Sequence, residues 1–385
     1  MYLSPIRDFV SFIAFFFFLW YYYRNHVKEA KCRMQNKALI AMSGGVDSSV
    51  AAYLTMSEGL DCIGATMLLC DRELMGQIHF TNPADDARSV AKRLGMEFHL
   101  LDRSTAFREK VVDYFVDAYE QGATPNPCIQ CNKHIKFDEL LSAALALDCH
   151  WIVTGHYARI RQDENTGRWL LYKAADAAKD QSYFLASLNQ HQLSHSRFPL
   201  GEMTKEQARQ IAEEQGFINA RKRDSQDICF IPDGDYLEFI RRYTGKEYPC
   251  GEFLDMTGKV VGKHNGAIGY TLGQRKGLGL AMGTPVYVCG KDMCANTVTV
   301  GPNEALFSNT LTANNWNWIP FPTLEESMRV IAKARSRHTG APATVYPEEN
   351  GIARVVFDQP QRAITPGQAV VLYDGDLVIG SGTIL

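Results

Sequence analysis

A short glycine-containing loop is the first part of the chain whose residue types suit a chemical task. It reads Ser43-Gly-Gly-Val-Asp-Ser-Ser49 and directly follows the apolar run Ala38–Met42. Two glycines let the backbone turn tightly, and the N–H groups at the start of the following helix attract an anion. No Gly-Lys-Ser/Thr follows, which disfavours γ-phosphoryl transfer of the Walker type. The loop predicts a phosphate site; the alternative is an ordinary strand-to-helix turn capped by Asp47 or Ser48.

Three of the ten cysteines lie in surroundings that suit a reactive thiol. Cys128 and Cys131 form a CxxC pair in a proline-rich loop, and Cys229 follows the basic triplet at 221–223. We expect a helix to begin at 132–136, which places Cys131 near its N-terminus among cationic side chains. Such surroundings lower a thiol pKa from about 8.5 toward neutrality, and the thiolate is the reactive form. The density of cysteines is far below that of a disulfide scaffold, and several others sit singly in apolar runs.

These groups need a scaffold that brings distant parts of the chain together. Strand-like apolar runs recur at 38–42, 62–69, 97–101 and 151–154, separated by helical patterns at 83–94, 105–119 and 136–147. The alternation predicts an α/β fold with a doubly wound parallel sheet. Ligands of such sheets bind beyond the carboxyl ends of the strands, so the loops after Met42, Leu69 and Thr154 are expected to share one crevice.

The sequence pattern changes near Leu200. Thr204–Gln215 reads as a capped amphipathic helix, and a Gly-rich stretch continues to Gly283. After Pro285, short apolar runs at 286–289, 297–300, 329–334, 353–357 and 369–373 predict an antiparallel β-barrel. The expected division is a hydrophobic and aromatic extension at 1–35, the sheet domain at 36–200, a small central connecting domain at 201–284 and the barrel at 285–385.

Composition excludes some classes of protein. At 46% hydrophobic and 22% charged residues, the chain has the balance of a soluble globular protein, which excludes a disordered or collagen-like chain. The net charge of −3 provides no overall basic field, so any contact with nucleic acid must come from local patches.

The first 35 residues differ from the rest. Phe15–Tyr23 reads FFFFLWYYY, which is costly to expose to water, and the uncharged stretch Phe9–Tyr23 is short for a bilayer span of about 20 residues. Three interpretations fit: translation that begins at Met34, a peripheral membrane anchor, and a targeting peptide. In each, we expect a soluble, cytoplasmic body without an obligatory membrane partner; the aromatic segment leaves peripheral membrane association open.

Six motifs in order across residues 36–385 resemble the MnmA/TrmU family of tRNA-specific 2-thiouridylases. They are MSGGVDSSVAA from Met42, TPNPCIQCNKHIKF from Thr124, TGHYAR from Thr154, KDQSYFL from Lys179, DSQDICFI from Asp224 and GQRKGLG from Gly273. The glycine loop resembles the pyrophosphatase loop (PP-loop) of adenine-nucleotide α-hydrolases, which split ATP between its α and β phosphates. The resemblance implies that the wobble uracil of certain tRNAs is adenylated on its C2 oxygen and then receives sulfur, giving 2-thiouridine, AMP and pyrophosphate.

The resemblance also implies roles for individual residues. Cys229 would carry a persulfide sulfur delivered by a partner protein, and Cys131 would be the paired nucleophile that frees the sulfur or forms a disulfide with Cys229. ATP would be bound by Ala41, Met42, Ser43, Gly44, Gly45, Val46, Asp47, Ser48, Met67 and Gly155, with Asp47 helping to place magnesium. The tRNA would contact Asn126, Pro127, Cys128, His156, Lys179, Asp180, Gln181, Arg335, Ser336 and Gln368, the first three at the target base.

Several alternatives remain open from the sequence. Cys128 stands where many relatives have Asp, and with Cys131 and Cys229 it could ligate a [4Fe-4S] cluster whose fourth iron binds hydrosulfide. His156 could be an ordinary hydrogen-bonded loop histidine, and Lys179 and Arg275 could be merely solvated charges. Other functions are an ATP-dependent amidotransferase or ligase that shares the loop, and an RNA-binding module with a relic nucleotide site.

Overall fold

The computed structural model describes residues 36–70, 83–222 and 228–385. The extension predicted at 1–35, with its start-site, anchor and targeting interpretations, lies outside these residues. In the part of the chain that is described, no helix is both long enough and apolar enough to cross a membrane.

A five-stranded parallel sheet forms the first part of the fold, in the order β3-β2-β1-β4-β7. Its strands are β1 (Lys37–Ala41), β2 (Asp61–Leu68), β3 (Glu97–Asp102), β4 (Trp151–Val153) and β7 (Ser196–Arg197). The centre of β1 is buried on both faces, as expected of a covered parallel strand. Because β1 pairs in parallel with both β2 and β4, the strand order reverses between β1 and β4. The predicted doubly wound sheet is confirmed, and its switch point lies beside the glycine loop.

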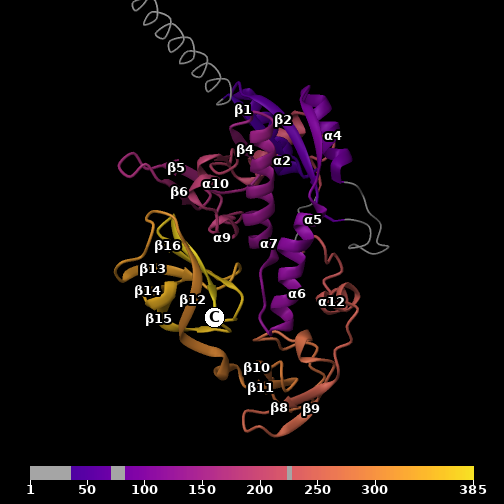
Figure 1. Cartoon of the computed structure of the whole chain (residues 1–385), viewed down its shortest axis with the longest axis vertical. Helices are drawn as coiled ribbons and strands as arrows, with labels where there is room; N and C mark the ends of the chain where they lie inside the picture. Colours follow the sequence, from indigo (N-terminus) through magenta and orange to yellow (C-terminus); the bar gives the residue numbers. More distant parts are fainter. Residues whose placement is uncertain (1–35, 71–82, 223–227) are drawn as a thin grey trace, which may run out of the picture.

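Helices cover this sheet or connect it to the rest of the chain (Figure 1). They include α2 (Val46–Ser57), α4 (Pro83–Leu94), α9 (Ser182–Leu185), α10 (Gln190–Ser194) and α11 (Lys205–Glu214). The predicted cap of α11 is present: the Thr204 and Gln207 side chains each accept a hydrogen bond from the other residue's backbone N–H.

Two longer helical segments lie between the C-terminal barrel and α12 (Tyr236–Thr244) in Figure 1. The first runs through α5 (Ser104–Phe107), η1 (Arg108–Val112) and α6 (Asp113–Glu120); the second runs through α7 (Pro127–Gln130), η2 (Cys131–Glu139) and α8 (Leu140–Ala146). The expected helix start at 132–136 is wrong. The helix begins at Pro127, after the N-cap Asn126, whose side chain accepts a hydrogen bond from the Cys128 N–H. Cys128 therefore lies in the first turn, and Cys131 lies one turn deeper.

A four-stranded sheet follows, in the order β10-β11-β8-β9. Its strands are β8 (Gly251–Leu254), β9 (Val260–His264), β10 (Tyr287–Asp292) and β11 (Thr297–Gly301). The runs at 286–289 and 297–300 therefore do not join the C-terminal barrel, because β11 pairs with β8. Strand pairing alone does not define a domain, so the boundaries at 200/201 and 284/285 stay predictions.

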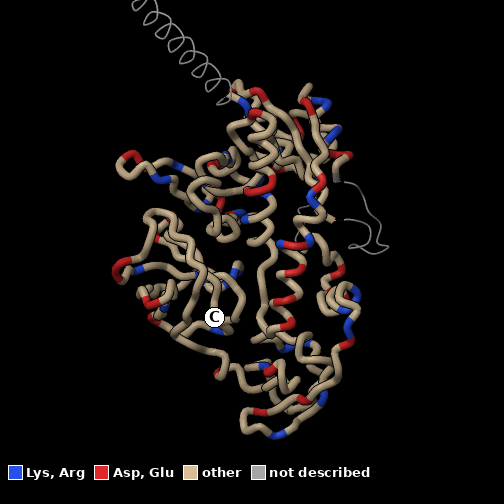
Figure 2. Tube along the Cα trace, viewed as in Figure 1, with Lys and Arg blue, Asp and Glu red and all other residues tan. Residues whose placement is uncertain are grey.

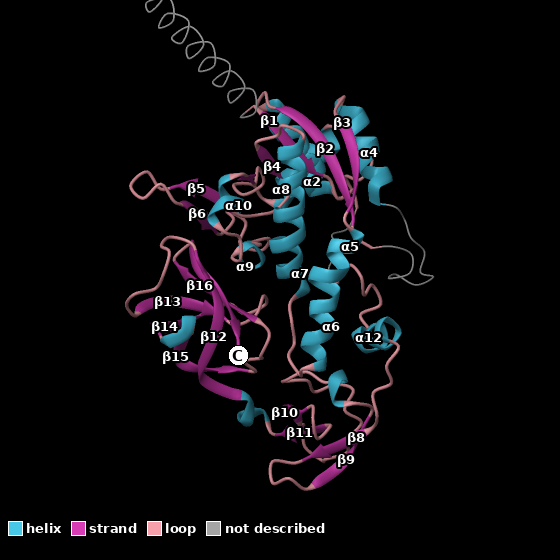
Figure 3. Cartoon of the chain, in the orientation of Figure 1, coloured by secondary structure: helices cyan, strands magenta, loops and turns pink. Residues whose placement is uncertain are grey.

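The C-terminal strands close into the predicted antiparallel barrel (Figure 3). Its strands are β12 (Phe307–Trp318), β13 (Met328–Lys333), β14 (Ala341–Pro347), β15 (Ala353–Arg362), β16 (Ala369–Asp374) and β17 (Leu377–Ile384). β12 pairs with both β15 and β17, which closes the barrel. Alternate residues such as Val355 and Phe357 fill its core. The hairpin β5 (Arg159–Gln162) and β6 (Trp169–Tyr172), an addition that the sequence did not suggest, extends β17 and joins the barrel to the first sheet.

Candidate active site

The glycine loop connects β1 to α2 at the switch point. Gly44 has φ +71°, a conformation that favours glycine. The Ser43 N–H donates to Ser48 Oγ (3.2 Å), and the hydroxyls of Ser48 and Ser49 donate to the Gly45 carbonyl (3.1 and 3.0 Å). Gly45 is the N-cap of α2, and no side chain caps the helix. The loop is thus fixed by its own hydroxyls and presents a helix N-terminus, as an anion site requires.

The loop after β4 packs directly on this helix start. A Cβ on Gly155 would lie 2.6 Å from both the carbonyl carbon of Asp47 and the nitrogen of Ser48. Real Cβ contacts of that length do not occur, so only glycine fits between the two backbones. Two of the loops that the sequence placed in one crevice therefore meet.

Replacing Gly155 by Ala is expected to weaken ATP binding at least about tenfold, because one of the two backbones must move by an appreciable fraction of an ångström. The thermal shift induced by ATP measures the effect. Gly167, in the β5–β6 turn, has nothing within 4 Å of an added Cβ but a positive φ. Gly167→Ala therefore introduces backbone strain without a steric clash, and it should bind ATP with wild-type affinity. An equal loss of ATP affinity in both variants would show that the close packing at Gly155 is not the cause.

A buried lysine that the sequence analysis missed contacts the loop. Lys205, 3% exposed at the start of α11, donates to both carboxylate oxygens of Asp47 (2.7 and 2.8 Å). The Tyr157 hydroxyl donates to Asp47 Oδ1 (2.9 Å). In sequence, nothing distinguishes Lys205 from a solvated lysine on an amphipathic helix.

The segment after α11 also returns to the loop. The Asn219 amide donates to the Gly44 carbonyl (3.2 Å) and to Ser49 Oγ (2.9 Å). Lys222, from the basic triplet, donates to the Gly44 carbonyl (3.3 Å) and pairs with Asp86 (2.8 Å). The glycine loop is therefore flanked by two cations, Lys205 and Lys222, which suit a polyphosphate ligand. Elsewhere, both signs of charge are spread over the chain (Figure 2).

The thiols converge on one hydrophobic cluster beneath the helical segments. Cys131 is buried in this cluster with Phe230 and Ile231, the residues that directly follow the exposed Cys229. The Phe230 ring packs edge-on against Phe107 (5.7 Å between ring centroids) and Phe115 (5.4 Å). Although almost 100 residues separate them in sequence, Cys131 and Cys229 are thus brought into the same neighbourhood, where they and Cys128 interact electrostatically.

The three thiols differ in acidity. A hydrogen bond from Cys70 and the charge of Lys136 lower the pKa of Cys229 to about 7, against the opposing desolvation by the protein atoms around the thiol. Burial raises the pKa of Cys131 to about 12, and it also raises the pKa of Cys128. The expectation of a lowered pKa at Cys131 is therefore wrong, because burial outweighs the nearby Lys136. Cys229 is the thiol that ionises near neutrality.

The charge of Lys136 favours that ionisation, so Lys136→Gln should raise the pKa of Cys229. Alkylation of Cys229 by iodoacetamide in the wild type should rise as the pH increases through about 7. In Lys136→Gln, the pH profile of Cys229 alkylation should move to higher pH, and the alkylation rate at pH 7 should fall about threefold to tenfold. Peptide mass analysis measures the rate at each pH. Lys133→Gln is the matched control, and an unshifted profile in the Lys136 variant would show that its charge does not act on Cys229.

The other predicted nucleotide residues lie around the loop. Met42 and Val46 are buried, Ala41 is half-buried at the end of β1, and Met67 is half-buried near the end of β2. The Thr66 hydroxyl donates to the Met42 carbonyl (2.6 Å), so β2 ends against the loop. Met67 packs in both the sheet core and the thiol cluster, which places it between the two halves of the site.

Several residues that were predicted to contact tRNA form hydrogen bonds within the protein. His156 is hydrogen-bonded to Thr154 Oγ1 (2.7 Å), and burial, with Lys136 as a smaller cause, holds its pKa well below the usual value. Asp180 accepts from the N–H of Ala174 and from Ser182, and Gln181 accepts from the Tyr157 N–H. Lys179 is half-buried beside them.

The barrel positions the start of the cysteine loop. The Thr124 N–H donates to the Pro366 carbonyl (2.9 Å), and the Gln368 amide donates to the Thr124 carbonyl (2.7 Å). Asn126 and Pro127 follow at the helix start. The predicted tRNA residue Gln368 therefore holds the loop that carries Cys128.

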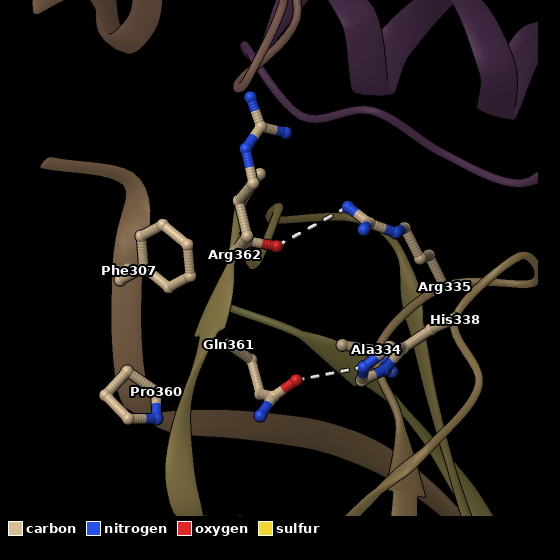
Figure 4. Close-up of a pocket in the computed structure, with 8 residues that line it drawn as sticks. Phe307, Ala334, Arg335, His338, Pro360, Gln361 and Arg362 are labelled. Carbon is tan, nitrogen blue, oxygen red and sulfur yellow. Dashed lines mark hydrogen bonds between the residues drawn. The ribbon is translucent and has the colours of Figure 1, made fainter. Parts of the chain in front are cut away.

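Arg335 lies at a pocket on the barrel, with Ser336 next to it in sequence. The pocket has a volume of about 160 Å³, with Phe307 and Pro360 on one side. Arg335 donates to the Arg362 carbonyl (3.4 Å), and His338 is hydrogen-bonded to Gln361 (2.9 Å), as Figure 4 shows. Arg335 is exposed.

The three cysteines do not form a metal site as they stand. Among residues 36–70, 83–222 and 228–385, no group of three or more His, Cys, Asp or Glu side chains is arranged to hold a metal ion. The donor set of Cys128, Cys131 and Cys229 therefore does not fit a cluster in this arrangement.

A parallel sheet with a glycine loop at its switch point is typical of a nucleotide-binding enzyme, and the sequence of this loop resembles the PP-loop. Family models match three segments: a "tRNA methyl transferase HUP domain" at 36–233, a "tRNA methyl transferase PRC-barrel domain" at 237–302 and an "Aminomethyltransferase beta-barrel domain" at 308–384. The chain belongs to the family of tRNA-specific 2-thiouridylases.

Several relatives carry that family name, "tRNA-specific 2-thiouridylase MnmA", and two of them are compared with this chain. The one from Clostridioides difficile is 46% identical over 355 residues, covering 91% of this chain and 98% of the relative. The one from Acetivibrio thermocellus is 48% identical over 356 residues, covering 91% and 99%. Among solved structures, the U34-tRNA thiolase NcsA from Methanococcus maripaludis with its [4Fe-4S] cluster is 18% identical, is matched over 56% of this chain and 74% of that chain, and has a TM-score of 0.33.

Proposed function

We propose that this protein catalyses the ATP-dependent 2-thiolation of the wobble uridine of tRNA, as a tRNA-uridine 2-sulfurtransferase. One observation carries the proposal beyond family membership: β2 ends against the glycine loop through Thr66, and Met67 then packs into the cluster of the thiols. An ATP-binding loop and a thiol that ionises near neutrality are the two components that exchange of a carbonyl oxygen for sulfur requires.

Adenylation is the first step of the proposed reaction. The loop at 43–48 binds the phosphates of ATP, with Lys205 and Lys222 balancing their charge. The C2 oxygen of the uracil attacks the α-phosphorus, the bond to the β-phosphate breaks, and pyrophosphate leaves. The C2 oxygen then belongs to an AMP leaving group. A magnesium ion requires few protein ligands because the phosphates supply the others; Asp47, already paired with Lys205, is the carboxylate at the loop.

Sulfur transfer is the second step. Cys229 carries a persulfide, received from a sulfur-donor protein, and its terminal sulfur attacks C2 and displaces AMP. The uracil is then attached through a disulfide to Cys229, and a second thiol must break that bond to release 2-thiouridine. Cys131 is the partner that the family resemblance implies, although its raised pKa keeps it protonated at neutral pH.

The tRNA is proposed to approach across the first sheet and the barrel. Asn126, Pro127 and Cys128, at the start of the helix that leads to Cys131, are proposed to contact the target base. Arg335 and Ser336 on the barrel, with Lys179 near α9, provide contacts to the backbone. Four further side chains are proposed to contact the tRNA through atoms that their internal hydrogen bonds do not use: His156, Asp180, Gln181 and Gln368.

Mass analysis of tRNA nucleosides tests the function. Cells that lack the chain should lose 2-thiouridine from the wobble position, and the purified protein with ATP, tRNA and a persulfide donor should restore it with release of pyrophosphate. Release of pyrophosphate without thiolation would instead favour an amidotransferase or ligase, and background release with cognate tRNA would favour a non-catalytic RNA-binding module.

The iron–sulfur alternative has a separate test. Protein purified without oxygen should be assayed for iron, for brown colour and for activity after chelation. Iron bound in stoichiometric amount, with activity lost on chelation, would replace the persulfide chemistry. Absence of iron with full activity would eliminate the cluster.

A further inference from the structure

Two lysines from distant parts of the chain lie over one buried tyrosine ring. The amine of Lys173, directly after β6, lies 4.7 Å from the centroid of the Tyr373 ring. The amine of Lys333, the last residue of β13, lies 5.4 Å from the same centroid. Tyr373, on β16, is fully buried and packs in one core cluster with Leu39 and Ile152 of the first sheet. The two positive charges are therefore held at the seam between the barrel and the first sheet.

Contacts within the protein fix both lysine side chains. Lys173 Nζ donates to the Gly375 carbonyl (2.7 Å). The stem of Lys333 runs past Gly340, where an added Cβ would lie 3.4 Å from its Cγ and 3.8 Å from its Cε. The ring of Tyr373 attracts both amines by cation–π interaction. The pair is thus preorganised.

The charge of the pair is only partly balanced. In the part of the chain that the structure describes, Lys333 Nζ forms no hydrogen bond. Asp180 is the carboxylate that acts on it, but the oxygens of Asp180 already accept from the Ala174 N–H and from the N–H and hydroxyl of Ser182. Burial lowers the pKa of Lys333, the charge of Asp180 raises it, and the charge of Lys173 lowers it. Two amines that repel each other favour an anion that binds them.

The pair adjoins residues that were predicted to contact tRNA. Ser182 directly follows the predicted contacts at 179–181, and its hydroxyl is hydrogen-bonded to the Tyr373 hydroxyl (3.3 Å). Ala332 and Ala334 belong to the barrel core, so Lys333 between them faces outward, and the exposed Arg335 follows two residues later. None of the six motifs contains either lysine, so the family resemblance gives them no role.

We propose that Lys173 and Lys333 bind phosphate groups of the tRNA backbone. The inference rests on the proposed function and adds a phosphate-binding site at the seam between the two domains that the tRNA crosses. An ammonium group binds phosphate as a point charge and does not read the base. The site therefore positions the tRNA and does not select its sequence.

The salt dependence of tRNA binding tests the site. Fluorescence anisotropy with a labelled tRNA transcript gives the affinity of the full-length protein between about 50 and 200 mM KCl. Each phosphate contact contributes about 0.7 to 0.9 to the slope of log affinity against log salt concentration. Lys173→Gln and Lys333→Gln should each reduce the slope by about that amount and weaken binding about threefold to tenfold at low salt. Lys92→Gln, on the exposed side of α4, is the matched control and should keep the wild-type slope.

The slope separates phosphate binding from a role in packing. A lysine that only packs on Tyr373 lowers the melting temperature when it is replaced, but it leaves the slope unchanged, because the slope counts the counterions that tRNA releases. Lys333→Arg keeps the charge and should keep the wild-type slope. Unchanged slopes in both Gln variants would overturn the site.

A footprint on the wild-type protein decides if the variants do not fold. Bound tRNA should protect Lys173 and Lys333, but not Lys92, from acetylation by acetic anhydride, as read by peptide mass analysis. Equal acetylation of the pair with and without tRNA would refute the site and leave the thiolation proposal intact. A wild-type protein that binds no tRNA refutes both.

Discussion

Cys229→Ser is expected to lower 2-thiouridine formation by about 10³-fold or more, with binding of ATP retained. Cys229 is the exposed thiol whose pKa lies near 7, so it is the sulfur that ionises and accepts a persulfide under neutral conditions. A serine hydroxyl carries no sulfane sulfur. The loss should therefore approach that of removing a covalent nucleophile. Liquid chromatography with mass detection of tRNA nucleosides measures the product.

The partial reactions identify which step the variant loses. ATP should still protect Cys229→Ser against thermal unfolding, because the loop at 43–48 does not contain the cysteine. Cys250→Ser, an exposed cysteine outside the thiol cluster, is the matched control and should retain full activity. Undiminished turnover in Cys229→Ser would eliminate sulfur transfer through this residue and favour the amidotransferase or ligase interpretation.

The sheet was predictable because its signals are local. The four runs at 38–42, 62–69, 97–101 and 151–154 match β1 to β4 within about one residue, since continuous apolar residues between helical patterns are typical of covered parallel strands. β7, only two residues long, gives no such signal. β10 and β11 have ordinary strand patterns, but the prediction that they join the C-terminal barrel was wrong. Strand pairing depends on contacts between distant parts of the chain, which the periodicity of the sequence does not encode.

The sequence predicted which motif residues form the site, but it predicted their contacts and pKa values only in part. The glycine loop, Cys131 and Cys229 stand in recognisable motifs, whereas Lys205 acts through contacts across the fold. The acidity of Cys131 was misjudged for a related reason. Sequence shows Lys136 nearby, but it does not show that Cys131 faces Phe230 and Ile231, where burial outweighs a single charge.

The second large effect is expected at Lys205. Lys205→Met should lower the single-turnover rate of pyrophosphate release by about 10²- to 10³-fold, comparable to the loss of one preorganised electrostatic group in an active site. Two causes act together. First, the glycine loop loses a cation where negative charge develops in the transition state. Second, Asp47 at the helix N-terminus loses the hydrogen bonds from Lys205 and keeps the one from the Tyr157 hydroxyl. Alkylation of Cys229 at pH 7 should be unchanged and serves as the check that the thiol half of the site remains folded.

A double-mutant cycle with Asp47→Asn distinguishes the two causes. If Lys205 acts only by pairing with Asp47, its removal should not slow the Asp47→Asn protein further; if Lys205 also stabilises the leaving phosphates, its removal should slow the Asp47→Asn protein further. We expect the second result, because both amine contacts to Asp47 lie beside the loop that must hold pyrophosphate. Lys246→Met is the matched control, since Lys246 is an exposed lysine paired with Glu120 (2.7 Å) away from the loop. Wild-type pyrophosphate release in Lys205→Met would mean that the buried pair only stabilises the fold, and a lowered melting temperature alone would then be its measurable effect.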